Sequence, residues 1–189
     1  MTSGPNGPDS LDAALGAFLS GLDQAPWFAA LGEALTPSER ADAEGYLTGL
    51  GFENIDVHLI TDWGQANAAI QDPNWDQRWW DSAERERQAL LLDANSAHTE
   101  IALMSGLSRV TQAASKRLPG FAAEAAARHG ISDQGLIKAA SGAASEAAYQ
   151  AALALAAGAP ASHPFALKYN LFEAGHWPLA VVGNRFDLF

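Results

Sequence analysis

Histidine and glutamate side chains at helical positions suggest metal chemistry. Helix bundles that hold two metal ions between carboxylates use two Glu-x-x-His pairs, each with both side chains on one helical face. The chain does not contain two such pairs. The remaining candidates are His98, Glu100 and Glu146, but His98 and Glu100 would point about 200° apart on one helix. We therefore expect no metal or other cofactor, and a site built from these three residues is the alternative.

A second group of reactive side chains lies near the C-terminal end of the sequence. His163, Lys168, Glu173 and His176 could form an acid–base or anion-binding cleft with Trp177 as its wall, because imidazole titrates near neutral pH. The competing interpretation places both histidines in turns next to proline, with each ring hydrogen-bonded to the backbone. We favour the turns, since nothing in the sequence fixes how these side chains converge.

Motifs for nucleophilic or phosphate chemistry are missing from the sequence. The small-residue segments 105–108 and 141–145 are not Gly-x-Ser-x-Gly elbows, and no glycine-rich segment is followed by Lys-Ser or Lys-Thr. The chain has no cysteine, which excludes disulfides, thiolate metal sites and cysteine nucleophiles. No catalytic residue can be assigned from these patterns.

Three tryptophans lie close together in the segment 75–80. Trp75 and Trp79 are one helical turn apart and Trp80 is beside them, so a helix would place Trp75 and Trp79 on one face. Such a cluster packs the start of a helix or forms a stacking platform for a ligand. We carry both interpretations, with packing favoured.

Apolar periodicity and capping residues predict a series of helices. Thr36-Pro37-Ser38-Glu39 is a capping box with proline at the first helical position. The longest helix is expected to end before Pro119 and Gly120. Ala140, Ala144, Ala148 and Ala152 would let a second helix approach closely. The predicted helices begin at Asp9 or Ser10, Pro26, Pro37, Thr61 or Asp62, Asp76 or Asp81, Phe121, and Ser132 or Asp133.

Alternating residues predict a small sheet. Residues 55–60 have the period of a half-buried strand, and the same alternation recurs in 167–173, 179–182 and 185–189. Gly183-Asn184 suits a hairpin turn. We expect the C-terminal segment to form an antiparallel meander that pairs with residues 55–60, with its last strand at an edge.

Composition limits the classes of function. The formal net charge of -11 and pI near 4.7 argue against nucleic-acid binding, which needs Lys and Arg. Residues 1–8 are rich in Pro, Gly and Ser, which predicts a flexible leader, and no apolar stretch is long enough for a membrane helix. The Ala-rich, acidic composition is bacterial-like, and we expect a cytoplasmic protein that does not bind membranes.

These patterns predict a mainly α (α+β) fold, with one helical domain over residues 9–189, a long central helix and a small antiparallel sheet. The favoured function is non-catalytic binding of a protein partner, a second copy or an apolar small molecule. The alternative is an enzyme or metal-binding bundle with a site between the long helix and the C-terminal segment, drawing on His98, Glu100, His163 and His176. The candidate ligand-binding residues are Trp75, Trp79, Trp80, His98, His176 and Trp177.

Overall fold

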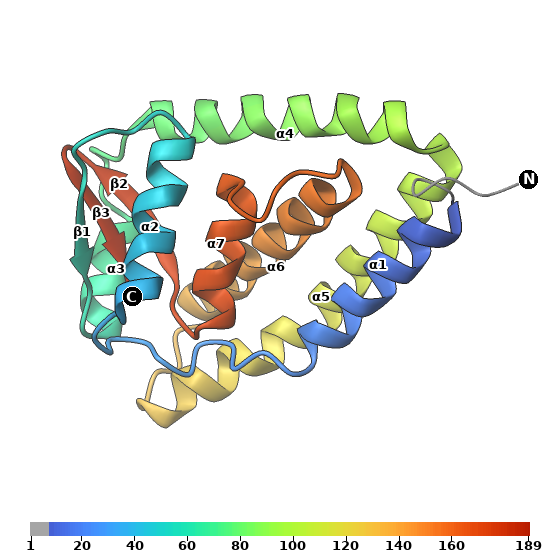
Figure 1. Cartoon of the computed structure of the whole chain (residues 1–189). Coiled ribbons are helices and arrows are strands. Elements are labelled where there is room, and N and C mark those ends of the chain that lie inside the picture. The colour runs from blue at the N-terminus through green and yellow to red at the C-terminus, as the bar shows by residue number, and fades with distance from the viewer. Residues whose placement is uncertain (1–7) are drawn as a thin grey trace, which may run out of the picture.

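The computed structural model describes residues 8–189, and this part of the chain is mainly helical with one small sheet, as the sequence predicts (Figure 1). All but the last residue of the leader predicted for 1–8 lies outside the described residues. None of the helices described is long and apolar enough to cross a bilayer. The elements in order are α1 (Pro8–Leu22), α2 (Pro37–Gly49), β1 (Asp56–Leu59), α3 (Trp63–Ile70), α4 (Gln77–Ala97), α5 (Glu100–Arg128), α6 (Gln134–Ala156), α7 (Pro164–Glu173), β2 (Pro178–Val182) and β3 (Arg185–Leu188).

Small side chains allow α5 and α6 to form the most extensive helix pair of the fold. Ala122 and Ala125 of α5 are fully buried, as are Ala140, Ala144 and Ala148 of α6. The predicted close approach at these α6 alanines is confirmed. Figure 1 shows α1 alongside α5, and α7 enclosed between α2 and α6. The helices therefore surround α7. This helix supplies large aromatic side chains to a core to which α5 and α6 contribute alanines.

The prediction of a single helix from Asp76 or Asp81 to Lys116 is wrong. The helix ends at Ala97, where the chain changes direction before a second helix begins (Figure 1). His98 is extended, and the Thr99 side chain accepts a hydrogen bond from Ala102 N at 3.3 Å. Threonine at this position satisfies an N–H group that a helix start leaves unpaired. A new helix, α5, therefore begins at Glu100.

The predicted helix end at Pro119 is also wrong, since α5 continues through it to Arg128. Pro119 and Gly120 lie on the exposed side, while Leu118 and Ala122 are fully buried. A proline inside a helix costs about 3 kcal/mol. Burial of the α5 face against α6 offsets this cost, so residues 121–128 are part of the same helix.

The helix predicted from Pro26 to Leu35 is absent, and turns replace it. Phe28 has φ 59° and Gly32 has φ 77°, which a right-handed helix does not allow. Tertiary contacts select this path: Trp27 and Phe28 are both buried, and Ala30 N donates to Gly175 O at 3.2 Å. These tertiary contacts stabilise the turns more than the local helical propensity stabilises a helix.

Residues 164–173 form helix α7, whereas the alternation in this segment predicts a strand. Pro164 occupies the first turn and His163 caps it, with the ring Nδ1 accepting from Phe165 N at 3.2 Å. Phe165, Leu171 and Phe172 are all fully buried. A helix that is covered on several sides loses its clear apolar stripe, which explains the wrong prediction.

The sheet is mixed rather than antiparallel, with the order β1-β3-β2. β3 pairs antiparallel with β2 across the predicted Gly183-Asn184 turn and parallel with β1. The pairing of residues 55–60 with the C-terminal segment is therefore confirmed, but the last strand is central, not an edge. Asp76 N donates to Val181 O at 2.7 Å, so the start of α4 covers the free side of β2.

Candidate functional site

A cavity of about 200 Å³ lies where the sheet end of the molecule meets the helices. It is bounded by α2, α3, α4, α6, α7 and the start of β2, so its walls come from six elements distant in sequence. The lining residues are Tyr46, Ile70, Trp79, Trp80, Ala83, Ala139, Ala143, Glu146, Lys168, Trp177, Pro178 and Leu179.

Three indole rings supply most of the apolar wall. Trp80 is 53% exposed and stands at the mouth, whereas Trp177 is 1% exposed. Trp79 is in the first turn of α4, where Asp76 caps the helix by accepting from Arg78 N at 2.9 Å, and its ring lies 6.5 Å from that of Phe186. Thus two sequence-predicted tryptophans from α4 and a third from the α7–β2 connection meet at one cavity.

A short chain of polar groups enters this apolar wall from α6 and α7. Lys168 is buried, and its Nζ donates to Gln150 Oε1 at 3.1 Å. Gln150 Nε2 in turn donates to Glu146 Oε1 at 2.9 Å, with Glu146 exposed at the surface. Burial lowers the pKa of Lys168, and the charge of Glu146 partly opposes this.

Two further donors belong to residues that line the cavity. Burial raises the pKa of the Tyr46 hydroxyl, and the Glu146 charge raises it further, so the hydroxyl keeps its proton. The Trp79 N–H lies close enough to the Tyr46 oxygen to oppose this rise in pKa, yet Trp79 Nε1 is buried without a hydrogen bond of normal geometry. Because a buried N–H without a partner is costly, a ligand oxygen would relieve it.

This combination of groups suits recognition of a small molecule. Ligand sites are mainly apolar, with a few polar groups that fix orientation. Here the rings offer flat surfaces, and Lys168, Tyr46 and the Trp79 N–H offer hydrogen bonds on one side.

A scan against protein-family models finds no match, and neither does a search of the curated proteins or of the solved structures. The geometry of this chain is therefore what bears on its function.

The residues of the alternative metal site do not meet. His98 Nε2 is 2.8 Å from Ala156 O, and Glu100 is exposed at the start of α5. Glu146 lies on α6 about 15 Å before Ala156 along the helix axis. Across residues 8–189, no group of three or more His, Asp or Glu side chains is placed to hold a metal ion.

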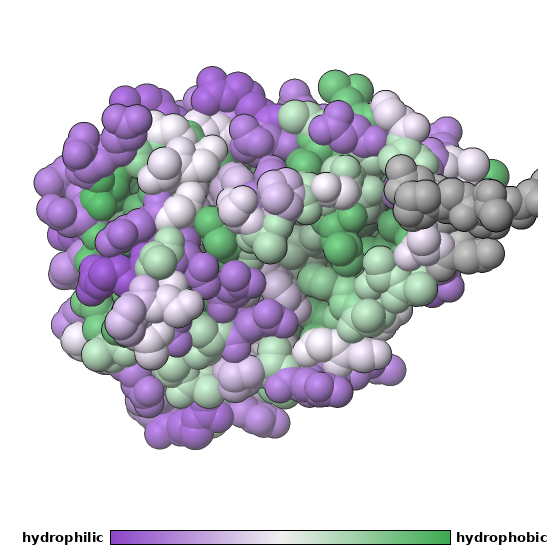
Figure 2. All heavy atoms as spheres, viewed as in Figure 1, coloured by the Kyte–Doolittle hydropathy of each residue, from purple (hydrophilic) through white to green (hydrophobic). Residues whose placement is uncertain are grey.

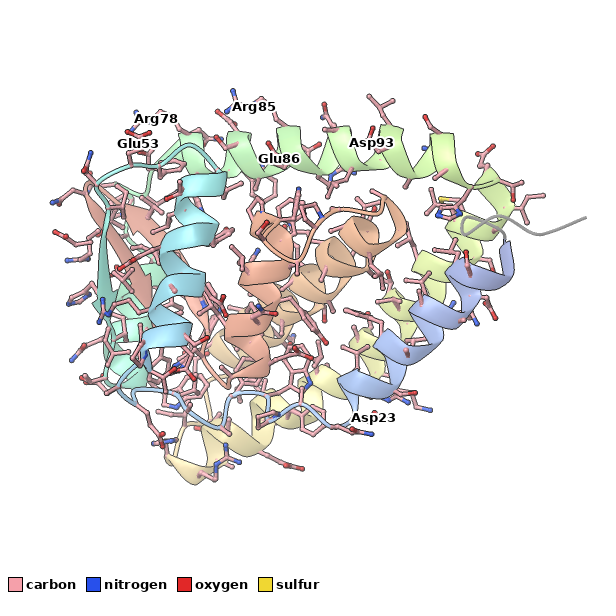
Figure 3. All side chains as sticks on the ribbon, in the orientation of Figure 1. Asp23, Glu53, Arg78, Arg85, Glu86 and Asp93 are labelled. Atoms are coloured by element: carbon pink, nitrogen blue, oxygen red, sulfur yellow. The ribbon has the colours of Figure 1, made fainter. Side chains whose placement is uncertain are left out.

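The two histidines near the C-terminal end lie at opposite ends of α7, so they do not form the cleft that was the alternative to the favoured turns, and of the two rings His163 has the predicted backbone hydrogen bond. His163 caps the helix and its Nε2 is 3.6 Å from Glu86 Oε2, on the side of α4 that Figure 3 shows beneath the ribbon. His176 is 1% exposed, with Nε2 3.6 Å from Glu39 Oε2 and Nδ1 unpaired. Burial lowers the pKa of both rings. Only Lys168 of the predicted group, with Trp177, reaches the cavity.

Trp75 stands outside the cavity. It precedes α4 and forms a backbone bridge with Val182, so it does not share a helical face with Trp79 as predicted. Its side chain is 39% exposed. A stacking platform at this cavity would therefore consist of Trp79, Trp80 and Trp177, without Trp75.

Sequence reasoning missed Tyr46, which lines the cavity, and Gln150, which binds the Lys168 amine. Tyr46 resembles any core aromatic on α2, and Gln150 only interrupts an alanine-rich segment. The sequence did distinguish Lys168, because it is the one charged residue between Pro164 and Phe172. A charge among residues that are otherwise buried requires a polar partner, but the sequence does not say which.

Two other sets of charged side chains have structural partners. Asp187 is fully buried in β3, where His58 Nδ1 lies at 2.8 Å and Arg185 Nε at 2.7 Å, which ties β1 to β3. A wider hollow of about 300 Å³ is lined by Arg78 and Arg85 on the outer side of α4 (Figure 3). Arg78 is paired with Asp76 and Arg85 donates to Ser82. These contacts account for the charges without a ligand.

Proposed function

We propose that this protein binds a small neutral aromatic compound, in the cavity between Trp79, Trp80 and Trp177. The observation that carries the proposal is the convergence of these rings, from separate parts of the chain, around hydrogen-bond donors. The ring of the ligand would lie against the indoles, and an oxygen substituent would accept from Trp79 N–H or Tyr46. This is one of the binding classes that the sequence predicts.

The volume of the cavity supports a ligand with one ring. A cavity of about 150 Å³ is large enough for benzene. The cavity here is about 200 Å³, which leaves room for a ring with one polar substituent. A compound with two fused rings and side groups would need the walls to move.

Charge supports a neutral ligand rather than an anion. The chain has a formal net charge of -11, and Glu146 stands exposed at the cavity, so an approaching anion is repelled. Lys168 is the cation that could attract it, but burial lowers the pKa of Lys168, and Gln150 and Glu146 already lie on its polar side. A neutral carbonyl compound is not repelled by the negative charge and does not need a positively charged Lys168.

The indole N–H signals in a nitrogen–proton NMR spectrum test this proposal, with benzamide as the probe. The chain has six tryptophans, and variants at each assign the signals. We expect benzamide to shift those of Trp79, Trp80 and Trp177, with Trp27 and Trp75 unmoved. Binding of so small a probe should be in the millimolar range, about -4 kcal/mol.

Two variants that remove one indole each provide the matched comparison. Trp80→Ala should weaken benzamide binding about tenfold, because it removes one stacking wall. Trp75→Ala should leave the affinity unchanged, since Trp75 does not line the cavity. Equal losses in both variants, or benzoate binding tenfold more tightly than benzamide, would contradict a neutral ligand held by these rings.

Binding of a protein partner or a second copy stays a prediction from the sequence. It draws on a different surface, where large apolar side chains are exposed. Figure 2 shows hydrophobic atoms over the half of this face that α1 and the end of α4 form, while the half with the sheet and α2 is largely hydrophilic. Besides Trp80, the exposed large apolar residues on α4, α5 and α6 are Leu92, Ile101, Met104 and Leu155.

A further inference from the structure

Lys168 is held in an unusual position for a lysine. Its side chain is buried against α6, lines the aromatic cavity, and has the amide oxygen of Gln150 as its hydrogen-bond partner at 3.1 Å. Among the ion pairs of the described residues none includes Lys168. A lysine is rarely buried without a paired carboxylate, so its position in the cavity wall calls for an explanation beyond packing.

The surroundings of the amine favour nucleophilic chemistry. Desolvation is the larger influence on Lys168 and lowers its pKa, while Glu146 acts in the opposite direction. Lysines used for imine chemistry are activated by desolvation in apolar pockets. One N–H is directed to Gln150, which leaves the other substituents and the lone pair of a neutral amine free to turn toward the cavity.

The other lysines of the chain provide an internal comparison. The sequence contains three, and Lys116 and Lys138 are both exposed. Neither lines the aromatic cavity. Any chemistry that depends on burial and on a bound ring should therefore distinguish Lys168 from the other two.

We infer that the Nζ of Lys168 condenses with the carbonyl carbon of an aromatic aldehyde or ketone bound between the tryptophans, forming an imine. This inference rests on the proposed function and adds the reactive group of the ligand. It assigns Lys168 a covalent role, with Tyr46 as a hydrogen-bond donor to the carbonyl oxygen and Glu146 as the proton carrier in the same cavity.

The step balances with the groups present. The amine lone pair attacks the carbonyl carbon, the carbonyl electron pair moves to oxygen, and one amine proton is transferred to that oxygen, giving a carbinolamine. The nitrogen lone pair then forms the C=N bond as the C–O bond breaks, and the hydroxyl group leaves with the second amine proton as water. Tyr46, which keeps its proton, can donate to the oxygen, and the carboxylate of Glu146 can accept and return protons.

Reductive trapping tests the inference on the full chain. The protein is incubated at pH 7 with benzaldehyde and sodium cyanoborohydride, which reduces an imine to a stable benzylamine, then digested and mapped by mass spectrometry. We expect Lys168 to carry the benzyl group at least about tenfold more than Lys116 or Lys138, because Lys168 lines the cavity in which the ring is held close to its amine, whereas the other two lysines do not. Labelling that favours the exposed lysines, or spares Lys168, would overturn the inference.

Variants separate the role of Lys168 from general reactivity. Lys168→Met should remove the preferred label while Lys116→Met, at an exposed position on α5, should keep it. If Lys168→Met does not fold, the map of the wild-type chain still decides the result. Benzamide separates the two proposals, because its carbonyl does not form imines: indole shifts with benzamide but no trapping at Lys168 refute only the imine, whereas no shifts refute the proposed function.

Discussion

At the scale of single residues, the cost of burying Lys168 is the most informative feature of the cavity. A buried ammonium group loses its hydration, and one amide oxygen at 3.1 Å replaces little of it. The folded chain therefore holds this proton less tightly than the unfolded chain does. Such a difference in proton affinity between the two states makes the stability depend on pH.

We expect the free energy of unfolding to rise with pH below about pH 10.4 because of Lys168. An unfolded lysine has a pKa of about 10.4, and burial lowers the pKa in the folded state. Between the two values the unfolded chain binds more protons, so stability increases with pH, by at most about 1.4 kcal/mol per pH unit. Urea unfolding at several pH values measures this slope.

Lys168→Met should flatten this rise, and Lys116→Met should not. Above about pH 9 a separate fall is expected in all three proteins, because burial raises the pKa of Tyr46 and Tyr169 in the folded state and unfolded tyrosines ionise first. In the wild-type chain and in Lys116→Met, the charge of Glu146 opposes the lowering of the Lys168 pKa. The measured slope of stability against pH already includes this effect. An unchanged slope in Lys168→Met would show that the amine is protonated in the fold.

At the scale of elements, the connection between α7 and β2 positions the inner wall of the cavity. Gly175 has φ 97°, and a Cβ added there would lie 2.6 Å from Ala30 N. The following residues are His176 and Trp177, both 1% exposed. The turn therefore needs glycine for its conformation and for its close contact with the segment after α1.

Gly175→Ala should destabilise the protein by about 3 kcal/mol, combining backbone strain with a contact that requires the chain to move. Gly183→Ala is the matched control: Gly183 also has positive φ, at 62°, but an added Cβ meets nothing within 4 Å. Its loss should be about 1 kcal/mol. Denaturant unfolding of both variants gives the comparison, and equal losses would mean that the contact with Ala30 is unimportant.

At the scale of the whole molecule, the central strand β3 joins parts of the chain that are far apart. Phe186 is fully buried, with its ring 5.8 Å from Tyr46 of α2 and 6.5 Å from Trp79 of α4. The two rings it supports are both walls of the cavity. The stability of the fold and the shape of the site thus depend on the same side chain.

Phe186→Ala should therefore reduce the free energy of unfolding by about 3–5 kcal/mol through loss of burial and the space it leaves. Leu92→Ala, at a side chain that is 70% exposed, should change it by less than about 0.5 kcal/mol. Thermal or urea unfolding measures both. A loss below about 1 kcal/mol for Phe186→Ala would contradict the central position of β3.

The elements that were predicted correctly have short-range causes. At the start of α2, Thr36 N donates to Glu39 Oε2 at 2.6 Å and Glu39 N to Thr36 Oγ1 at 3.3 Å, as the capping box requires. The Gly183-Asn184 turn joins β2 and β3 as predicted. In both places the residues that decide the structure lie within a few positions of each other.

The errors have long-range causes. The α7 segment carries patterns for a strand and for a helix, and burial by α2 and α6 decides between them. Residues 26–35 follow the helical period, but the pairing of Ala30 with Gly175 selects turns. For the site, the sequence identified Trp79, Trp80 and Trp177 as candidates without indicating that α4 and β2 adjoin.

The sequence by itself determined the mainly helical class, the capped helix starts, the hairpin turn and the acidic charge, because propensity, capping and charge act between neighbours. Only the tertiary structure decided the mixed sheet, the helical α7 and the meeting of three indoles with Lys168 and Tyr46. These depend on contacts between residues more than a hundred positions apart, such as Tyr46 and Phe186, whose energies no local pattern records.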